Sequence, residues 1–288
     1  MEEIIALLGP FPQIVPLNSK VIERVDCGNY IREKVEYDVE VDDRVSAYVC
    51  VPKNLTKKAP AIFCHHQHNR EFDIGKSEVV GLMGNKDQAY ASELAELGYV
   101  TFAPDAIAFE ERNWASPGSS EYHELASRLV KGETLMAKAI HDVMRGIDYL
   151  HSRDEVDAAK TGFIGHSYGG RMALWMPAFD ARIKTSVSNC GCVSYADSFP
   201  RDIGFQMEFC IPGIAIDHDV ASVVKNIKNC SLLISATDND VWSLGASKLY
   251  ELVKSNLGDM VELKLYEGGH EFRSEMRLYA YDFFSRAL

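Results

Sequence analysis

Short apolar runs alternate with amphipathic stretches through most of the chain, and this alternation constrains the fold more than any other feature. The stretches between the runs have helical spacing, and the strongest of them, 132–153, has apolar residues at i, i+3 and i+4 positions. Strands separated by helices predict a mostly parallel sheet with helices on both faces, an α/β fold. The apolar runs, which suit strands buried on both faces, lie at 61–66, 99–105, 161–167, 183–189 and 231–236.

The N-terminal part of the chain follows a different period. Apolar and polar residues alternate in 35–41 and again in 45–51, which is typical of half-buried antiparallel strands. Asp42 and Asp43 fit the turn between them. The same alternation in 261–268 predicts a strand at the edge of the sheet.

No repeat, linker or change of composition marks a domain boundary, so we expect one domain over residues 1–288. Two segments, 106–131 and 191–219, have neither the helix nor the strand period. Irregular segments of that length in a compact domain tend to be functional. We therefore expect both to be cap-like insertions that shape a site.

The charge of the chain excludes several classes of partner. Lys and Arg total 30 against 42 Asp and Glu, for a net charge of −12, and no basic run occurs. Nucleic acid and anionic membranes are therefore unexpected partners. The N-terminus reads as neither a secretory signal nor a membrane span, and the seven cysteines fit reduced thiols. We expect a cytoplasmic protein, in which Cys190 and Cys192 are small buried side chains; the oligomeric state stays open.

The segment Gly165-His166-Ser167-Tyr168-Gly169-Gly170 joins an expected strand to an expected helix. G-x-S-x-G in that context is the nucleophile elbow, a tight turn that exposes a strained serine. Side chains two residues before and after the serine would collide, so both positions need glycine. The helix N-terminus beyond it presents free N–H groups to a developing negative charge. Ser167 is therefore the candidate nucleophile.

A serine hydroxyl needs a base, and in such folds the acid and then the histidine follow the serine in the chain. His270 comes directly after the expected strand 261–268, whereas His218 lies in an irregular segment. We therefore expect His270 to be the base. Asp240 and Asp238 both follow the strand 231–236; we favour Asp240 as the acid and keep Asp238 as the alternative.

An oxyanion needs two backbone donors. The N–H of Tyr168 is one candidate, and the N–H of Gln67 or His68, just past the strand 61–66, is the other. The histidines at 65, 66 and 68 could suggest a metal, but a strand would point them to opposite faces and no acid lies beside them. We expect no metal there.

Together these features resemble the α/β-hydrolase superfamily, and within it the dienelactone hydrolase-like and acetyl-esterase-like groups. The resemblance rests on HHQHN, PDAIAFEER, the GHSYGG elbow and the late Asp and His, all in the expected order, with ATDNDVW favouring Asp240. It implies a hydrolase without metal or organic cofactor. Dienelactone hydrolases carry a cysteine nucleophile, so Ser167 shifts the expectation towards simple esters. Candidate substrate-pocket residues are His66, Trp242, Phe205 and Phe209.

We therefore expect a serine carboxylesterase that acts on a small-molecule ester through an acyl-enzyme. Thioesters, lactones and small peptides remain alternative substrates for the same residues. A catalytically silent α/β-hydrolase body used for binding is the alternative from another class.

Overall fold

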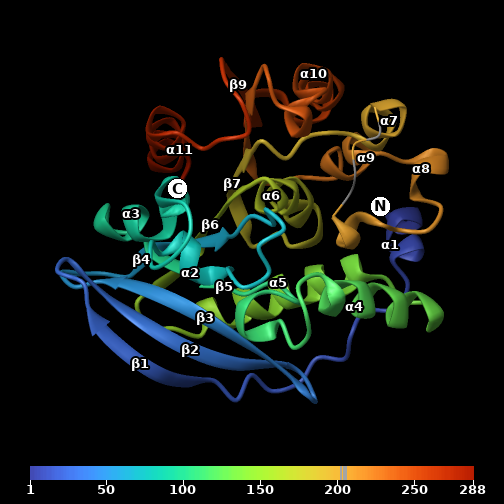
Figure 1. The fold of residues 1–288 in the computed structure, drawn as a ribbon. Helices are drawn as coiled ribbons and strands as arrows, with labels where there is room; N and C mark the ends of the chain where they lie inside the picture. Colours follow the sequence, from blue (N-terminus) through green and yellow to red (C-terminus); the bar gives the residue numbers. More distant parts are fainter. Residues whose placement is uncertain (202, 204–205) are drawn as a thin grey trace.

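The computed structural model of the protein describes residues 1–201, 203 and 206–288. Its centre is a nine-stranded sheet in the order β1-β2-β3-β5-β4-β6-β7-β8-β9 (Figure 1). Strands β4 to β9 are parallel to one another, and β1 to β3 form an antiparallel extension joined to β5. The bounds are β1 Lys20–Asp26, β2 Tyr30–Glu40, β3 Asp43–Pro52, β4 Ala59–His65, β5 Val100–Pro104, β6 Val156–His166, β7 Ile183–Asn189, β8 Ser231–Thr237 and β9 Val261–Tyr266. The predicted α/β-hydrolase architecture is confirmed.

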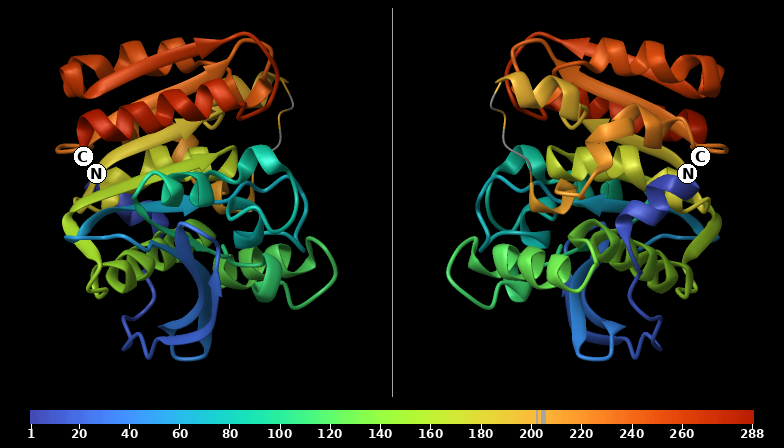
Figure 2. Two further views of the ribbon diagram at one scale, coloured as in Figure 1. Left: turned by 90° about the vertical axis from the view of Figure 1, so that its left-hand side faces the viewer. Right: turned by 90° about the vertical axis from the view of Figure 1, so that its right-hand side faces the viewer.

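Helices cover both faces of the sheet, as Figures 1 and 2 show. Three of them, α2, α3 and α11, share one apolar core, while α1, α5, α6, α9 and α10 share the other. Their bounds are α1 Glu2–Leu8, α2 Lys76–Val79, α3 Tyr90–Glu96, α5 Leu135–His151, α6 Tyr168–Phe179, α9 Val220–Val224, α10 Ala246–Leu257 and α11 Ser274–Ala287. No helix in the described part of the chain is both long and apolar enough to cross a bilayer.

Successive side chains of the central strands point alternately into the two cores on opposite faces of the sheet. In β4, Ile62 and Cys64 belong to the core under α3 and α11, and Phe63 belongs to the opposite core. Phe63 stacks on Phe163 of β6 with ring centroids 4.9 Å apart. Burying each such side chain contributes about 1.5–3 kcal/mol, so the strands that end at the site have a rigid base.

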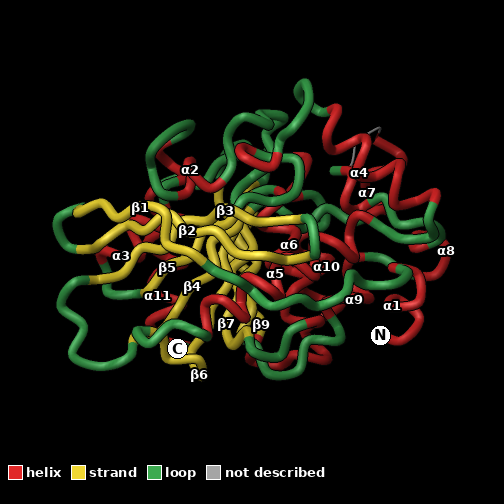
Figure 3. Tube along the Cα trace, turned by 90° about the horizontal axis from the view of Figure 1, so that it is seen from below, coloured by secondary structure: helices red, strands yellow, loops and turns green. Residues whose placement is uncertain are grey.

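The antiparallel strands pack against α5, and Figure 3, seen from below, shows them side by side across the near face of the molecule. Tyr37 of β2 stacks on Tyr149 of α5 at 5.4 Å, and Nε2 of His141 lies 2.8 Å from the carbonyl oxygen of Val39. As predicted from its alternation, β9 lies at the opposite edge of the sheet.

The two irregular segments contain short helices. Residues 106–131 include α4, Ser119–Val130, which the sequence pattern did not predict. Its Arg128 pairs with Glu124 of the same helix and with Glu133 and Glu40 outside it, so ion pairs help to fix its position. Residues 191–219 include α7 (Tyr195–Ser198), the 3₁₀ turns Phe199–Arg201 and Met207–Phe209, and α8 (Ile214–Asp217).

Candidate active site

Ser167 stands between the last residue of β6 and the first residue of α6. Its φ of 57° and ψ of −113° form the strained conformation of a nucleophile elbow. A Cβ on Gly165 would lie 2.3 Å from the carbonyl carbon of Gly169, and one on Gly169 would lie 2.2 Å from the carbonyl oxygen of His65. Both glycines are therefore required for this turn, as the sequence predicted.

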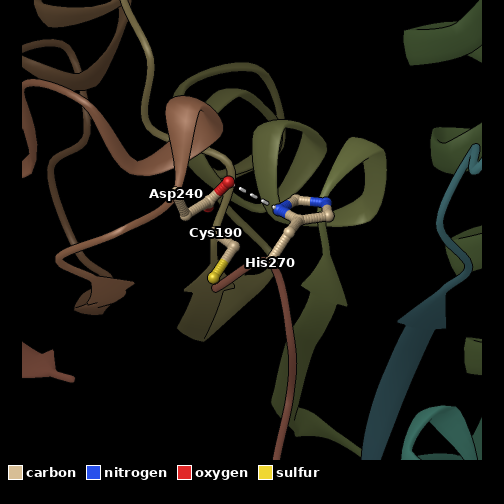
Figure 4. A group of neighbouring side chains, drawn as sticks. All are labelled: Cys190, Asp240 and His270. Carbon is tan, nitrogen blue, oxygen red and sulfur yellow. Dashed lines mark ion pairs between the residues drawn. The ribbon is translucent and has the colours of Figure 1, made fainter. Parts of the chain in front are cut away.

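His270 and Asp240 meet next to the elbow. Nδ1 of His270, in the loop after β9, lies 3.1 Å from Oδ1 of Asp240, which follows β8. The second ring nitrogen points away from Asp240 (Figure 4). That arrangement holds the imidazole by one nitrogen and leaves the other for a reacting group.

Several donors hold the carboxylate of Asp240 in its ionised form. Its Oδ2 accepts a hydrogen bond from the Ser243 hydroxyl at 2.6 Å, and its Oδ1 accepts one from the Trp242 N–H at 3.0 Å. Burial opposes ionisation, yet the hydrogen bond and charge of His270, with these two donors, lower the pKa of Asp240 below its ordinary value.

Asp238, the alternative acid, has another partner. Its exposed carboxylate accepts a hydrogen bond from the N–H of Gly268 at 3.0 Å, and the N–H of Asn239 donates to the carbonyl of Gly268 at 3.0 Å. These bonds tie the loop after β8 to the loop that carries His270. Asp238 thus positions the loop, and the structure places Asp240 at the imidazole.

A cavity of about 550 Å³ opens over Ser167. Ser167, His270 and Trp242 share its wall with residues from both irregular segments. The lining residues are His68, Asn69, Arg70, Phe72, Gly118, Glu121, Ser167, Gln206, Met207, Trp242 and His270. Of the predicted pocket residues, Trp242 lines it, and Phe205 lies outside the described residues.

His66 and Phe209 are not among the lining residues, which corrects their prediction as pocket walls. Nδ1 of His66 lies 2.7 Å from the Gln67 carbonyl oxygen, and its Nε2 accepts the N–H of Ala106 at 3.0 Å. Both ring nitrogens therefore already have hydrogen-bond partners, and the side chain is buried. Phe209 is buried, with its ring centroid 5.7 Å from that of Trp175.

The candidate oxyanion donors lie on two elements. Tyr168 is the first residue of α6, and Gln67 and His68 follow β4. In the described part of the chain, the backbone N–H groups of Tyr168, Gln67 and His68 donate to no other group. Free N–H groups at these positions can stabilise a negative oxygen at Ser167.

Two of the clustered histidines, His65 and His66, are neutral side chains in the folded protein. Burial lowers the pKa of His65 to about 4 and that of His66 to about 3. Nδ1 of His65 lies 3.0 Å from the His66 carbonyl oxygen, so neighbouring backbone carbonyls occupy one nitrogen of each ring.

Sequence reasoning missed a second acid–histidine pair in the same cavity. Nε2 of His68 lies 2.8 Å from Oε1 of Glu121, a residue of α4. Against the effect of burial, the hydrogen bond that His68 donates to Glu121 and the charge of Glu208 raise the pKa of His68. Glu208 is fully buried, and burial together with the charge of Glu121 raises its pKa to about 7. The pairing depends on α4, which no sequence pattern revealed.

Cys190 lies one residue past β7, and its sulfur is within 4.8 Å of ligand atoms of both Asp240 and His270. Burial raises the pKa of its thiol to about 11, so it is neutral in the folded protein. Cys192 is also buried, which agrees with the prediction that both are small buried side chains near a strand end.

Residues 74–283 match the dienelactone hydrolase family. The Bacillus subtilis (strain 168) protein YtaP is 31% identical over 195 residues, a match that spans 67% of this chain and 64% of YtaP. Among solved structures, the acetyl xylan esterase from Paenibacillus sp. R4 aligns with a TM-score of 0.73 and 18% identity over 95% of this chain and 90% of that one. The glucuronoyl esterase from Solibacter usitatus aligns with a TM-score of 0.69 and 17% identity over 99% and 91%. With its elbow, sheet order and matched length, the chain belongs to the dienelactone hydrolase family.

Proposed function

We propose that the protein is a serine esterase that cleaves carboxylic esters through Ser167, His270 and Asp240. The observation that carries the proposal is one shared cavity, lined both by the strained Ser167 and by His270, whose imidazole is paired with a buried carboxylate. Membership of a hydrolase family supports the same activity.

The first half of the reaction forms an acyl-enzyme. His270 takes the proton of the Ser167 hydroxyl as its oxygen attacks the acyl carbon. The N–H of Tyr168 and one from Gln67 or His68 hold the tetrahedral oxyanion. Asp240 stabilises the imidazolium, which then gives its proton to the departing alcohol.

The second half releases the acid. A water molecule loses a proton to His270 and attacks the acyl carbon, and collapse of the second oxyanion returns the proton to Ser167. Every proton transfer uses His270, so no organic cofactor is needed for this cycle.

The cavity wall supports a substrate with a short acyl group on a hydroxyl-rich alcohol. Oε1 of Glu121 accepts from His68, which leaves Oε2 as an acceptor, and Oε1 of Gln206 accepts from Arg171 at 2.9 Å, which leaves an amide donor. Phe72 and Met207 supply apolar contact. A largely apolar wall that carries these few polar groups suits an acylated carbohydrate, and the names of the structurally similar esterases agree with that class.

The segments 106–131 and 191–219 form, in this proposal, a small cap of a single-domain enzyme. They supply Gly118 and Glu121 from one side of the cavity and Gln206 and Met207 from the other. We further propose that the enzyme acts in the cytoplasm, where seven free cysteines suit a reducing compartment.

The proposal is tested by measuring hydrolysis of nitrophenyl acetate by the wild type and by Ser167→Ala, with a fluorophosphonate label as a second readout. We expect labelling of Ser167 and a loss of about 10⁴-fold or more in kcat for the variant. Acetylated xylosides, thioesters, lactones and short peptides, compared as substrates, then identify the acyl group and the leaving group. An inert wild type that no fluorophosphonate labels would instead support the binding-body alternative.

A further inference from the structure

Three potential metal ligands meet at the base of the candidate triad. Cys190, Asp240 and His270 come from the ends of three neighbouring strands, 50 and then 30 residues apart in the chain. A sulfur, a carboxylate oxygen and an imidazole nitrogen from them all lie within 4.8 Å of one another (Figure 4). We propose that these three residues bind a thiol-seeking divalent cation, zinc or cadmium, and that its binding switches the hydrolase off.

The donor set suits such an ion. Zinc takes sulfur, nitrogen and oxygen ligands in a tetrahedron, and its bond lengths put ligand atoms roughly 3.3–3.8 Å apart. The nitrogen and oxygen are already 3.1 Å apart. The Cys190 sulfur is held only loosely, 3.6 Å from the Glu271 carbonyl oxygen and 3.8 Å from the Thr237 hydroxyl. A small rotation of that side chain therefore completes three corners.

The charges balance when the ion binds. The cation replaces the proton of the Cys190 thiol and the Nδ1 proton of His270, and both protons leave to solvent. One thiolate and one carboxylate then neutralise the double positive charge in a buried setting. The ion would enter beside His270, which lines the cavity and whose side chain is 29% exposed.

Another cluster shows what excludes a metal. Oxygen atoms of Asp105, Glu110 and Glu111 lie equally close together, but the ammonium of Lys76 sits among them. Its Nζ is 2.7 Å from Asp105 and 2.6 Å from Glu110. The Lys76 ammonium thus neutralises the carboxylates of that cluster in place of a metal ion. By contrast, no Lys or Arg in the described part of the chain pairs with Asp240.

Binding at this site would stop the reaction. To act as a base at its other nitrogen, His270 must keep its Nδ1 proton and donate it in a hydrogen bond to Asp240, and the metal ion would replace that proton. The inhibitory half of the inference therefore rests on the proposed triad, while the binding half does not. Hard cations such as magnesium and calcium prefer oxygen ligands and should have no effect.

Two measurements test the inference. Cobalt(II) titration should produce a thiolate-to-cobalt charge-transfer band in the wild type and in Cys210→Ser, which removes an exposed thiol, but not in Cys190→Ala. Zinc should inhibit ester hydrolysis, and its half-inhibitory concentration should rise at least about 10-fold in Cys190→Ala or Cys190→Ser, relative to each variant's metal-free rate. The isosteric serine variant keeps the test available if the alanine variant does not fold.

The outcomes separate the two proposals. An equal band and equal inhibition in wild type and both Cys190 variants would overturn the metal site. A band that persists in Ser167→Ala supports the site independently of catalysis. A Cys190-dependent band without inhibition would overturn the switch and count against His270 as the base. If the wild type shows no cobalt band, the metal site is overturned. If Ser167→Ala nevertheless abolishes ester hydrolysis, the proposed esterase activity is unaffected by that result.

Discussion

Two carboxylate–histidine pairs face the same cavity, and only one of them suits catalysis. In the first, Nδ1 of His270 lies 3.1 Å from the buried Asp240. In the second, Nε2 of His68 lies 2.8 Å from Glu121, and Nδ1 of His68 accepts the N–H of Arg70 at 3.1 Å. Both nitrogens of His68 are therefore engaged, whereas one nitrogen of His270 is left for chemistry.

The difference shows that an acid beside a histidine does not make a general base. A base must keep one nitrogen free and within reach of the proton that it removes. His68 lacks that nitrogen, and its partner Glu121 lies on helix α4 rather than at a strand end. We infer that the second pair binds substrate and the first performs catalysis.

Replacing each of the two histidines in turn gives the largest expected difference in kcat. His270→Ala should reduce kcat for nitrophenyl acetate by about 10⁴- to 10⁶-fold, as loss of a triad base does. His68→Gln keeps the backbone N–H and should cost less than about 10-fold. Steady-state kinetics on both purified variants checks the contrast, and comparable losses would show that His68 also takes part in the chemistry.

The two aspartates after β8 give the next contrast. Asp240→Asn should lower kcat by about 10⁴-fold because an amide favours the wrong tautomer of His270. Asp238→Asn keeps an oxygen that can accept the Gly268 N–H and should change kcat by less than about threefold. Single-turnover acylation measured in stopped flow distinguishes them, and a larger loss in Asp238→Asn would reverse the assignment of the acid.

The positions of the candidate catalytic groups at strand ends could be predicted from the sequence because the strands themselves could. The run 183–189 coincides with β7, and the G-x-S-x-G segment fixes Ser167 through local sterics that glycine alone relieves. His270 follows from chain order. Length alone could not choose between Asp238 and Asp240, since that choice depends on which carboxylate the loop turns towards the ring.

The wall of the cavity could not be predicted because its residues come together only through tertiary contacts. Glu121 lies on α4, in a segment for which the sequence pattern predicted no helix, and its partner His68 is 53 residues away. The aromatic Phe209 suggested a pocket wall, yet the turn that carries it points the ring into the core beside Trp175. Composition alone does not tell which aromatic side chains face a cavity.

A smaller effect is expected at the second pair, and it should depend on the substrate. Glu121→Gln keeps the shape of the side chain but weakens acceptance of hydroxyl hydrogens, and should raise KM for an acetylated xyloside by about 10-fold. The kcat/KM for nitrophenyl acetate, which has no such hydroxyls, should stay within about threefold. Equal changes for both substrates would contradict a role of Glu121 in alcohol recognition.

The smallest effect concerns stability rather than rate, and it arises from Glu208 beside the second pair. Its pKa of about 7 lies above the ordinary value, so the folded state holds a proton that the unfolded state has released. The protein therefore loses stability from this group as pH rises from about 4.5 to 7, and carries the full cost above pH 7. Glu208→Gln removes that cost, which is at most about 3 kcal/mol.

Thermal unfolding at pH 5 and pH 8 tests the effect. Glu208→Gln should raise Tm at pH 8 by several degrees, since 1 kcal/mol moves Tm by about 2–4 °C in a domain of similar size, and should change it little at pH 5. The matched control is Glu251→Gln, an exposed carboxylate on α10, which should leave Tm unchanged at both values. A gain at pH 5 as large as that at pH 8 would mean that packing, rather than ionisation of a buried carboxyl, limits stability around the second pair.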